Sequence, residues 1–186
     1  MYTWGTTVAE RKLPFPCDRL LPEPDDALYR AVDVDAPVKT LFLWLCQLRV
    51  APYSYDWLDN LGRRSPQRLT PGLEQLEAGQ RFMRIFELAA FEPGKSITLQ
   101  TGRGRFASAV VSYVAEARPA GGSRLLVKVS VQYSRGWIAL PMRLGLAPGD
   151  LVMMRKQLGE LKRLAESSGE DADRQAPKKR PTAPPG

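Results

Sequence analysis

Apolar residues alternate with polar or small ones along two stretches in the second half of the chain, residues 106–118 and 124–133. The positions that point one way are Ala107, Ala109, Val111, Tyr113 and Ala115 in the first stretch, and Leu125, Val127, Val129, Val131 and Tyr133 in the second. A period of two is typical of antiparallel strands with one covered face and one face in water. Lys128, Ser130 and Gln132 are therefore expected on the wet face.

Earlier segments extend this pattern into a series of hairpins. Residues 80–91 predict one long strand and residues 96–101 its partner, joined by the turn residues Pro93 and Gly94. Turns at 102–105 and 119–122 connect the later strands, and a short edge strand is expected at 67–70. Four strands linked in succession form a meander, and so long a sheet twists and must curl around another element.

Helical spacing predicts the element around which the sheet curls. Residues 27–35 predict a first strand, after which Ala36 and Pro37 open a helix with proline in its first turn. A long last helix is expected over residues 148–167, with its apolar seam at Leu151, Met154, Leu158, Leu161 and Ala165. We therefore predict an α+β fold in which a curved antiparallel β-sheet grips a long C-terminal α-helix, with two short helices after the first strand.

The stretch that stands apart from this scaffold is residues 50–66, VAPYSYDWLDNLGRRSP. Helical spacing relates Val50, Tyr53, Trp57 and Leu61, so we predict the second short helix here, with Pro52 in its first turn. The polar side chains of the stretch are Tyr55, Asp56, Asn60, Arg63 and Arg64. The aromatic stripe is either ordinary packing, or it places these polar residues at the mouth of a cavity. The sequence leaves both interpretations open.

The two ends of the chain differ from the middle in composition. Residues 1–26 are rich in proline with little periodicity, which predicts an irregular arm that packs on the domain. Residues 168–186 have almost no bulky apolar residue, which predicts a disordered tail. A single domain is expected over residues 27–167.

Composition excludes several kinds of chemistry. The 186 residues include no histidine, so Ser-His-Asp and Cys-His catalysis and imidazole zinc sites are excluded. We expect no cofactor and no metal. Cys17 and Cys46 lack a metal or redox spacing and are expected to be reduced thiols. We find neither a signal peptide nor the roughly 20 apolar residues of a membrane span, so we expect a cytoplasmic protein.

The net charge of +7 raises the question of nucleic acid. The basic residues are scattered along the chain, so we expect no specific nucleic-acid partner. A diffuse positive surface instead favours anionic ligands or lipid headgroups. Transient contact with a membrane surface, and a monomeric or homodimeric state, remain open.

The order of elements resembles the START-like or Bet v 1-like helix-grip superfamily (SRPBCC), which includes polyketide cyclases, aromatases and lipid carriers. The local cue is VDVDAPVKTLFLW at residues 32–44, which looks like the first strand of that superfamily followed by its Ala-Pro helix start. Residues 50–66 look like a feature of an uncharacterised bacterial subset. The resemblance implies a cavity between sheet and helix, with wall residues Met83, Ile85, Tyr113, Val131, Tyr133, Met153 and Met154.

Three functions follow as hypotheses. The first is binding or transport of an apolar small molecule that is lipid, sterol-like or polyketide-like, with the polar residues of 50–66 as its fixing groups. The second is a cyclase or aromatase acting in the same cavity, with Asp56 or Tyr53 as acid or base. The third is a regulatory module that binds another protein through the N-terminal arm.

Overall fold

The computed structural model describes residues 3–54, 64–102, 107–133 and 152–169. The elements in chain order are β1 (Thr3–Trp4), the 3-10 helix η1 (Glu10–Lys12), α1 (Cys17–Leu20), β2 (Asp26–Val34), α2 (Val38–Cys46), the 3-10 helix η2 (Gln47–Arg49), β3 (Arg81–Phe82), β4 (Phe86–Glu92), β5 (Ser96–Thr101), β6 (Ala107–Ala117) and β7 (Ser123–Tyr133). A C-terminal helix follows at residues 152–169.

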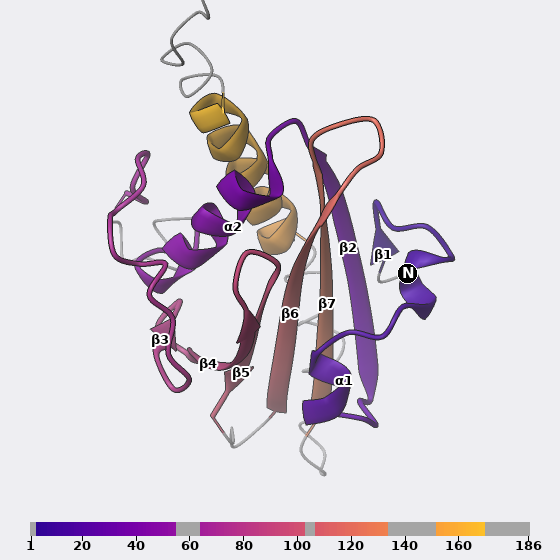
Figure 1. Cartoon of the computed structure of the whole chain (residues 1–186). Coiled ribbons are helices and arrows are strands. Elements are labelled where there is room, and N and C mark those ends of the chain that lie inside the picture. The colour runs from indigo at the N-terminus through magenta and orange to yellow at the C-terminus, as the bar shows by residue number, and fades with distance from the viewer. Residues whose placement is uncertain (1–2, 55–63, 103–106, 134–151, 170–186) are drawn as a thin grey trace, which may run out of the picture.

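In the described part of the chain, one seven-stranded sheet joins the strands in the order β1-β2-β7-β6-β5-β4-β3. Its neighbours are antiparallel except β1 and β2, which are parallel. Figure 1 shows α2 and the C-terminal helix together beside the sheet, and α1 lying over its other face. The predicted α+β architecture, with a C-terminal helix packed on a mostly antiparallel sheet, is confirmed.

The face toward the C-terminal helix, here called the inner face, carries the alternating apolar residues as predicted. Val111, Tyr113, Leu125, Val127 and Val129 all belong to one buried cluster with residues of α2 and the C-terminal helix. In that helix, the fully buried side chains are Leu158, Leu161 and Ala165. Burying each leucine contributes about 1.5–3 kcal/mol, so this seam is what holds the helix on the sheet.

The Ala-Pro start of the first short helix is also found. Pro37 is its N-cap and α2 follows directly. Leu41 and Leu45, one turn apart, are both fully buried. The Trp44 indole nitrogen donates to the Ser168 hydroxyl at 3.1 Å, which fixes α2 to the end of the C-terminal helix.

The expected helix over residues 50–62 does not begin where the spacing placed it. Residues 51–54 are not helical, and Tyr53 has φ of 54° in the left-handed region. Val50 is 45% exposed whereas Tyr53 is 1% exposed, so they do not share a buried stripe. Residues 55–63, including Trp57 and Leu61, lie outside the described part of the chain.

Two strand predictions were also wrong. Residues 80–91 form a tight hairpin of β3 and β4 instead of one strand, because Met83 and Arg84 adopt positive φ and reverse the chain. Residues 67–70 are not a strand. The Gln47 side chain bonds both the N–H (2.9 Å) and the carbonyl (3.2 Å) of Thr70, and so replaces a strand partner.

The outer face of the sheet is covered where the alternation predicted a wet surface. Lys128 is only 8% exposed and Ser130 is fully buried. The N-terminal segment lies over them: Phe15 and Cys17 form a second buried cluster with outer-face residues. The Cys17 N–H donates to the Ser112 hydroxyl at 2.9 Å. Small hydroxyl side chains on the outer face therefore accept this segment rather than water.

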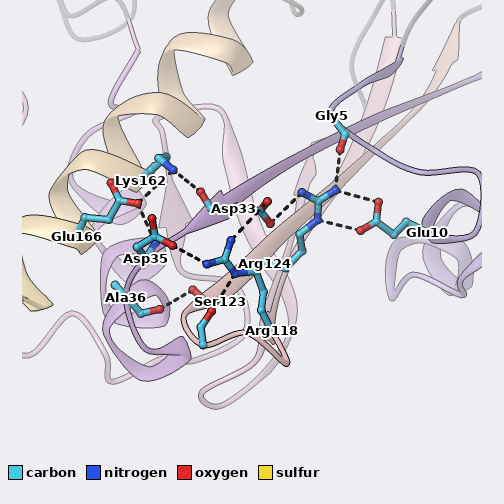
Figure 2. Close-up of polar contacts among 11 residues, drawn as sticks. Gly5, Glu10, Asp33, Asp35, Ala36, Arg118, Ser123, Arg124, Lys162 and Glu166 are labelled. Atoms are coloured by element: carbon cyan, nitrogen blue, oxygen red, sulfur yellow. Dashed lines mark hydrogen bonds and ion pairs between the residues drawn. The ribbon is translucent and has the colours of Figure 1, made fainter.

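Ion pairs join the N-terminal segment to the sheet, and Figure 2 shows Arg124 at their centre. The Arg124 guanidinium donates to both Glu10 carboxylate oxygens (2.8 and 3.0 Å), to Asp33 (3.1 Å) and to the Gly5 carbonyl (2.6 Å). The hydrogen bonds from Arg124 to the Glu10 carboxylate lower the pKa of Glu10 to about 2, against an ordinary value of 4.5. These contacts hold the segment from Gly5 to η1 against β7.

The same network continues to the C-terminal helix (Figure 2). Arg118, the first residue after β6, pairs with Asp35 at 2.5 Å. Glu166 accepts the Asp35 N–H at 2.8 Å, and Lys162 donates to the Asp33 carbonyl at 2.7 Å. The helix is thereby held at its far end, away from residue 152.

Candidate functional site

A row of side chains crosses the inner face at one level. Strand register sets Trp4 beside Arg30, Arg30 beside Val127, and Val127 beside Tyr113, from β1 to β6. Arg30 is fully buried and Tyr113 is 1% exposed. A guanidinium and a phenol in an apolar layer need polar partners, since an unpaired buried polar group is unfavourable by several kcal/mol. The row is therefore where the inner face offers polar chemistry.

The C-terminal helix covers this row with a glutamine. Gln157 is 4% exposed. Its amide nitrogen donates to the Pro52 carbonyl at 2.6 Å, and its amide oxygen accepts the Tyr113 hydroxyl at 2.8 Å. A carbonyl can only accept, so Pro52 fixes which end of the amide carries the nitrogen. It follows that the phenol is the donor in the second contact.

Two methionine sulfurs flank this contact. The Met83 sulfur lies 3.2 Å from the Gln157 amide nitrogen, and the Met154 sulfur lies 3.9 Å from the Tyr113 oxygen. Methionine is unbranched and polarizable, so it adapts to neighbours of irregular shape. The polar pair is thus bounded by side chains that can repack.

The other end of the row is closed by a cation on an aromatic ring. The Arg155 guanidinium lies 5.4 Å from the ring centre of Trp4. Arg155 and Gln157 both belong to the C-terminal helix, so its first described turns span the row from β1 to β6. A cation–π contact of this kind contributes about 0.5–2 kcal/mol, depending on its exposure to water.

Several predicted site residues lie in this layer. The inner cluster and the side chains packed against it include Tyr53, Met83, Tyr113, Val131, Tyr133 and Met154. Tyr53 packs edge-on against Trp44, with ring centres 6.0 Å apart at 89°. Its place in the structure is thus one of aromatic packing. Met153 is half-buried on the C-terminal helix.

Other predicted residues are placed elsewhere. Ile85 is 68% exposed, because it lies in the β3–β4 turn instead of in a strand of the sheet. Arg64 is exposed. The remaining polar residues of the stretch, Tyr55, Asp56, Asn60 and Arg63, lie outside the described residues.

Sequence reasoning missed Gln157, Arg30 and Trp4. A signal was present for two of them. Gln157 stands three residues after Met154 in the helical seam, and Arg30 alternates with Leu28 in β2. A polar residue at a position that the period assigns to the core indicates a buried partner. Trp4 lay in a segment without periodicity, so its place depends on the pairing of β1 with β2.

The thiols offer no nucleophile. Burial raises the pKa of the Cys17 thiol, and it raises that of Cys46 to about 12. The reactive thiolate form is therefore disfavoured at both residues. Over the described ranges, no three acidic or cysteine side chains are grouped to hold a metal ion. In the same ranges, no helix is long and apolar enough to cross a membrane.

Solved structures with the same arrangement of sheet and helix identify the fold. A hypothetical protein from Helicobacter pylori matches 86% of this chain and 98% of its own, with 12% identity and a TM-score of 0.53. A protein from Thermus thermophilus matches 77% of this chain and 99% of its own, with 11% identity and a TM-score of 0.52. The chain has the helix-grip fold.

A further structural similarity is to a protein of a biosynthetic pathway. The di-domain ARO/CYC StfQ from the steffimycin biosynthetic pathway matches 79% of this chain over 51% of its own, with 13% identity and a TM-score of 0.48. No protein-family model matches the sequence, and no curated protein matches it significantly. The row from Trp4 to Tyr113 lies in the layer between the sheet and the C-terminal helix.

Proposed function

We propose that this protein binds an apolar small molecule, of lipid, sterol-like or polyketide-like type, between the inner face of the sheet and the C-terminal helix. The observation that carries the proposal is the buried contact of Tyr113 with Gln157, flanked by Met83 and Met154. Sites for small molecules are mostly apolar, with a few placed polar groups that fix orientation. The two methionines suit an apolar guest of irregular shape.

A thermal-shift screen against fatty acids, sterols and aromatic polyketides tests this function. A ligand that binds only the folded state stabilises it by about 2.7 kcal/mol at a hundredfold excess over Kd. For a chain of this length that corresponds to a rise in Tm of roughly 5–11 °C. Native mass spectrometry of protein purified from its own host would show whether such a molecule co-purifies.

Two variants that each replace an alanine with tryptophan provide the test and its control. Ala109 is half-buried on the inner face of β6, whereas Ala117 is exposed at the end of the same strand. Ala109→Trp should fill the layer and abolish the Tm shift, while Ala117→Trp should preserve it. If no compound shifts the Tm of the unmodified protein and no molecule co-purifies, the proposed function is wrong.

A further inference from the structure

One hydrogen-bond donor of the inner layer points at a weak acceptor. The Gln157 amide nitrogen donates to the Pro52 carbonyl at 2.6 Å, and its second contact is the Met83 sulfur at 3.2 Å. A thioether sulfur accepts hydrogen bonds weakly. An oxygen in the place of that sulfur would form a stronger bond with the same N–H group, because this side chain is almost wholly removed from water.

Backbone strain surrounds the same amide. Among the described residues other than glycine, φ is positive at Tyr53 (54°), Met83 (44°) and Arg84 (67°). Such a conformation is unfavourable by about 1–2 kcal/mol per residue, and hairpin turns that need it usually contain Asn-Gly. Tyr53 follows Pro52 and Met83 supplies the sulfur, so both acceptors of the Gln157 nitrogen belong to strained segments. Strain of this kind collects at ligand sites, where the surrounding structure enforces it.

We propose that the ligand is an apolar molecule with a neutral carbonyl or hydroxyl oxygen, which replaces the Met83 sulfur as the acceptor of the Gln157 N–H. This inference rests on the binding function proposed above and adds the chemistry of the ligand. The Met83 side chain has several rotatable bonds, so it can withdraw from the amide while its backbone stays in place.

The neutral character of the ligand follows from the groups around the contact. An amide and a phenol are both uncharged, and an ionised ligand group in an apolar layer would need a cation beside it. Of the two cations described for this row, Arg30 lies two strands away from Tyr113, with Val127 between them, and the Arg155 guanidinium lies over Trp4 of β1. Arg30 also donates to the Tyr29 carbonyl at 3.0 Å, at its own end of the row.

Three naphthalene derivatives of matched shape distinguish a neutral oxygen, an apolar group and a charged group on the ligand. An acetylnaphthalene carries a ketone oxygen, the matching isopropylnaphthalene carries none, and the matching naphthoate carries a charged carboxylate. The same three head groups on a linear alkyl chain are titrated in parallel, to vary the apolar part. The ketone should bind the wild-type protein about tenfold more tightly than the hydrocarbon in at least one series. Gln157→Leu should abolish this preference.

Met83→Leu is the second variant, because exchanging these two residues nearly conserves volume and is well tolerated. Without the sulfur, the Gln157 N–H gains more from a ligand oxygen, so the preference for the ketone should rise about threefold. Equal binding of ketone and hydrocarbon, an unchanged preference in Gln157→Leu, or tightest binding of the carboxylate would each overturn this inference and leave the binding function standing. If neither series binds, the binding function itself fails.

Discussion

Removing one hydroxyl group tests the buried polar contact on which the site depends. Tyr113 and Gln157 are 1% and 4% exposed, and 2.8 Å separates the donor oxygen from the acceptor. Tyr113→Phe keeps the ring but leaves the amide oxygen of Gln157 without this donor. An unsatisfied buried acceptor is unfavourable by about 1–3 kcal/mol. With a central value of about 2 kcal/mol, the Tm of a chain this long should fall by roughly 4–8 °C.

The partner substitution completes a double-mutant cycle. Gln157→Leu removes the acceptor of Tyr113 and also the donor to the Pro52 carbonyl. It should therefore destabilise the protein more than Tyr113→Phe does, with a total loss of about 2–4 kcal/mol. In the double variant the phenol and the amide are both gone, and of the three groups only the Pro52 carbonyl has lost its partner. The two single losses should thus exceed the double loss by the cost of the unsatisfied amide oxygen plus that of the unsatisfied phenol, about 2–4 kcal/mol together.

Urea unfolding of the four proteins measures this coupling, with Gln132→Leu as the control. Gln132 is an exposed glutamine of β7, so its substitution should change the free energy of unfolding by less than about 0.5 kcal/mol. If the losses at Tyr113 and Gln157 add to within about 0.3 kcal/mol, the two side chains are not in contact. The candidate site would then lose its centre.

Three further predictions concern other parts of the molecule. Arg124 lowers the pKa of Glu10 to about 2, so the contribution of Glu10 to stability is present above the unfolded pKa near 4.5 and is lost as pH falls toward 2. In urea titrations, Glu10→Gln should lower the free energy of unfolding at pH 7 and reduce its further loss between pH 4.5 and 2. An unchanged loss over that range would contradict the pairing with Arg124. Gly5 and Gly94 have φ of 71° and 74°, but only at Gly5 would a Cβ overlap the β2 backbone. Gly5→Ala should therefore detach β1, which would appear as faster amide exchange along the edge of β2. Gly94→Ala should instead lower the free energy of unfolding by backbone strain alone, about 1 kcal/mol. Equal losses of stability in the two variants would refute the overlap at Gly5. The Cys46 thiol, fully buried with a pKa of about 12, should react with a disulfide reagent only in denaturant, and rapid labelling of the folded protein would refute its burial.

Local periodicity was enough for the scaffold. The alternation of β6 and β7 placed Val111, Val127 and Val129 on the buried face, and helical spacing placed Leu158 and Leu161 in the seam. Each of these elements has one face that must leave water, so its period can be read without knowing its neighbour. Ala36 and Pro37 marked the start of α2 for an equally local reason, the fixed φ of proline.

Predictions failed where distant contacts decide the backbone. The β3–β4 turn at Met83 and Arg84 uses left-handed conformations that neither residue prefers. Its Met83 N–H donates to the Leu48 carbonyl at 3.0 Å, a contact from η2 that no pattern within residues 80–91 contains. The residues of the outer face alternate in the sequence as they would on a surface exposed to water, but the N-terminal segment covers that face. These outcomes depend on which segments meet.

The sequence by itself therefore determined β2, β5, β6 and β7, the two main helices and the fold class, because the removal of apolar side chains from water imposes a period on each element separately. Only the tertiary structure decided the site. The Tyr113 and Gln157 contact joins residues 44 positions apart, and the row from Trp4 through Arg30 depends on strand register. A polar residue at a core position is unfavourable until its partner is in place, and folding alone brings that partner to it.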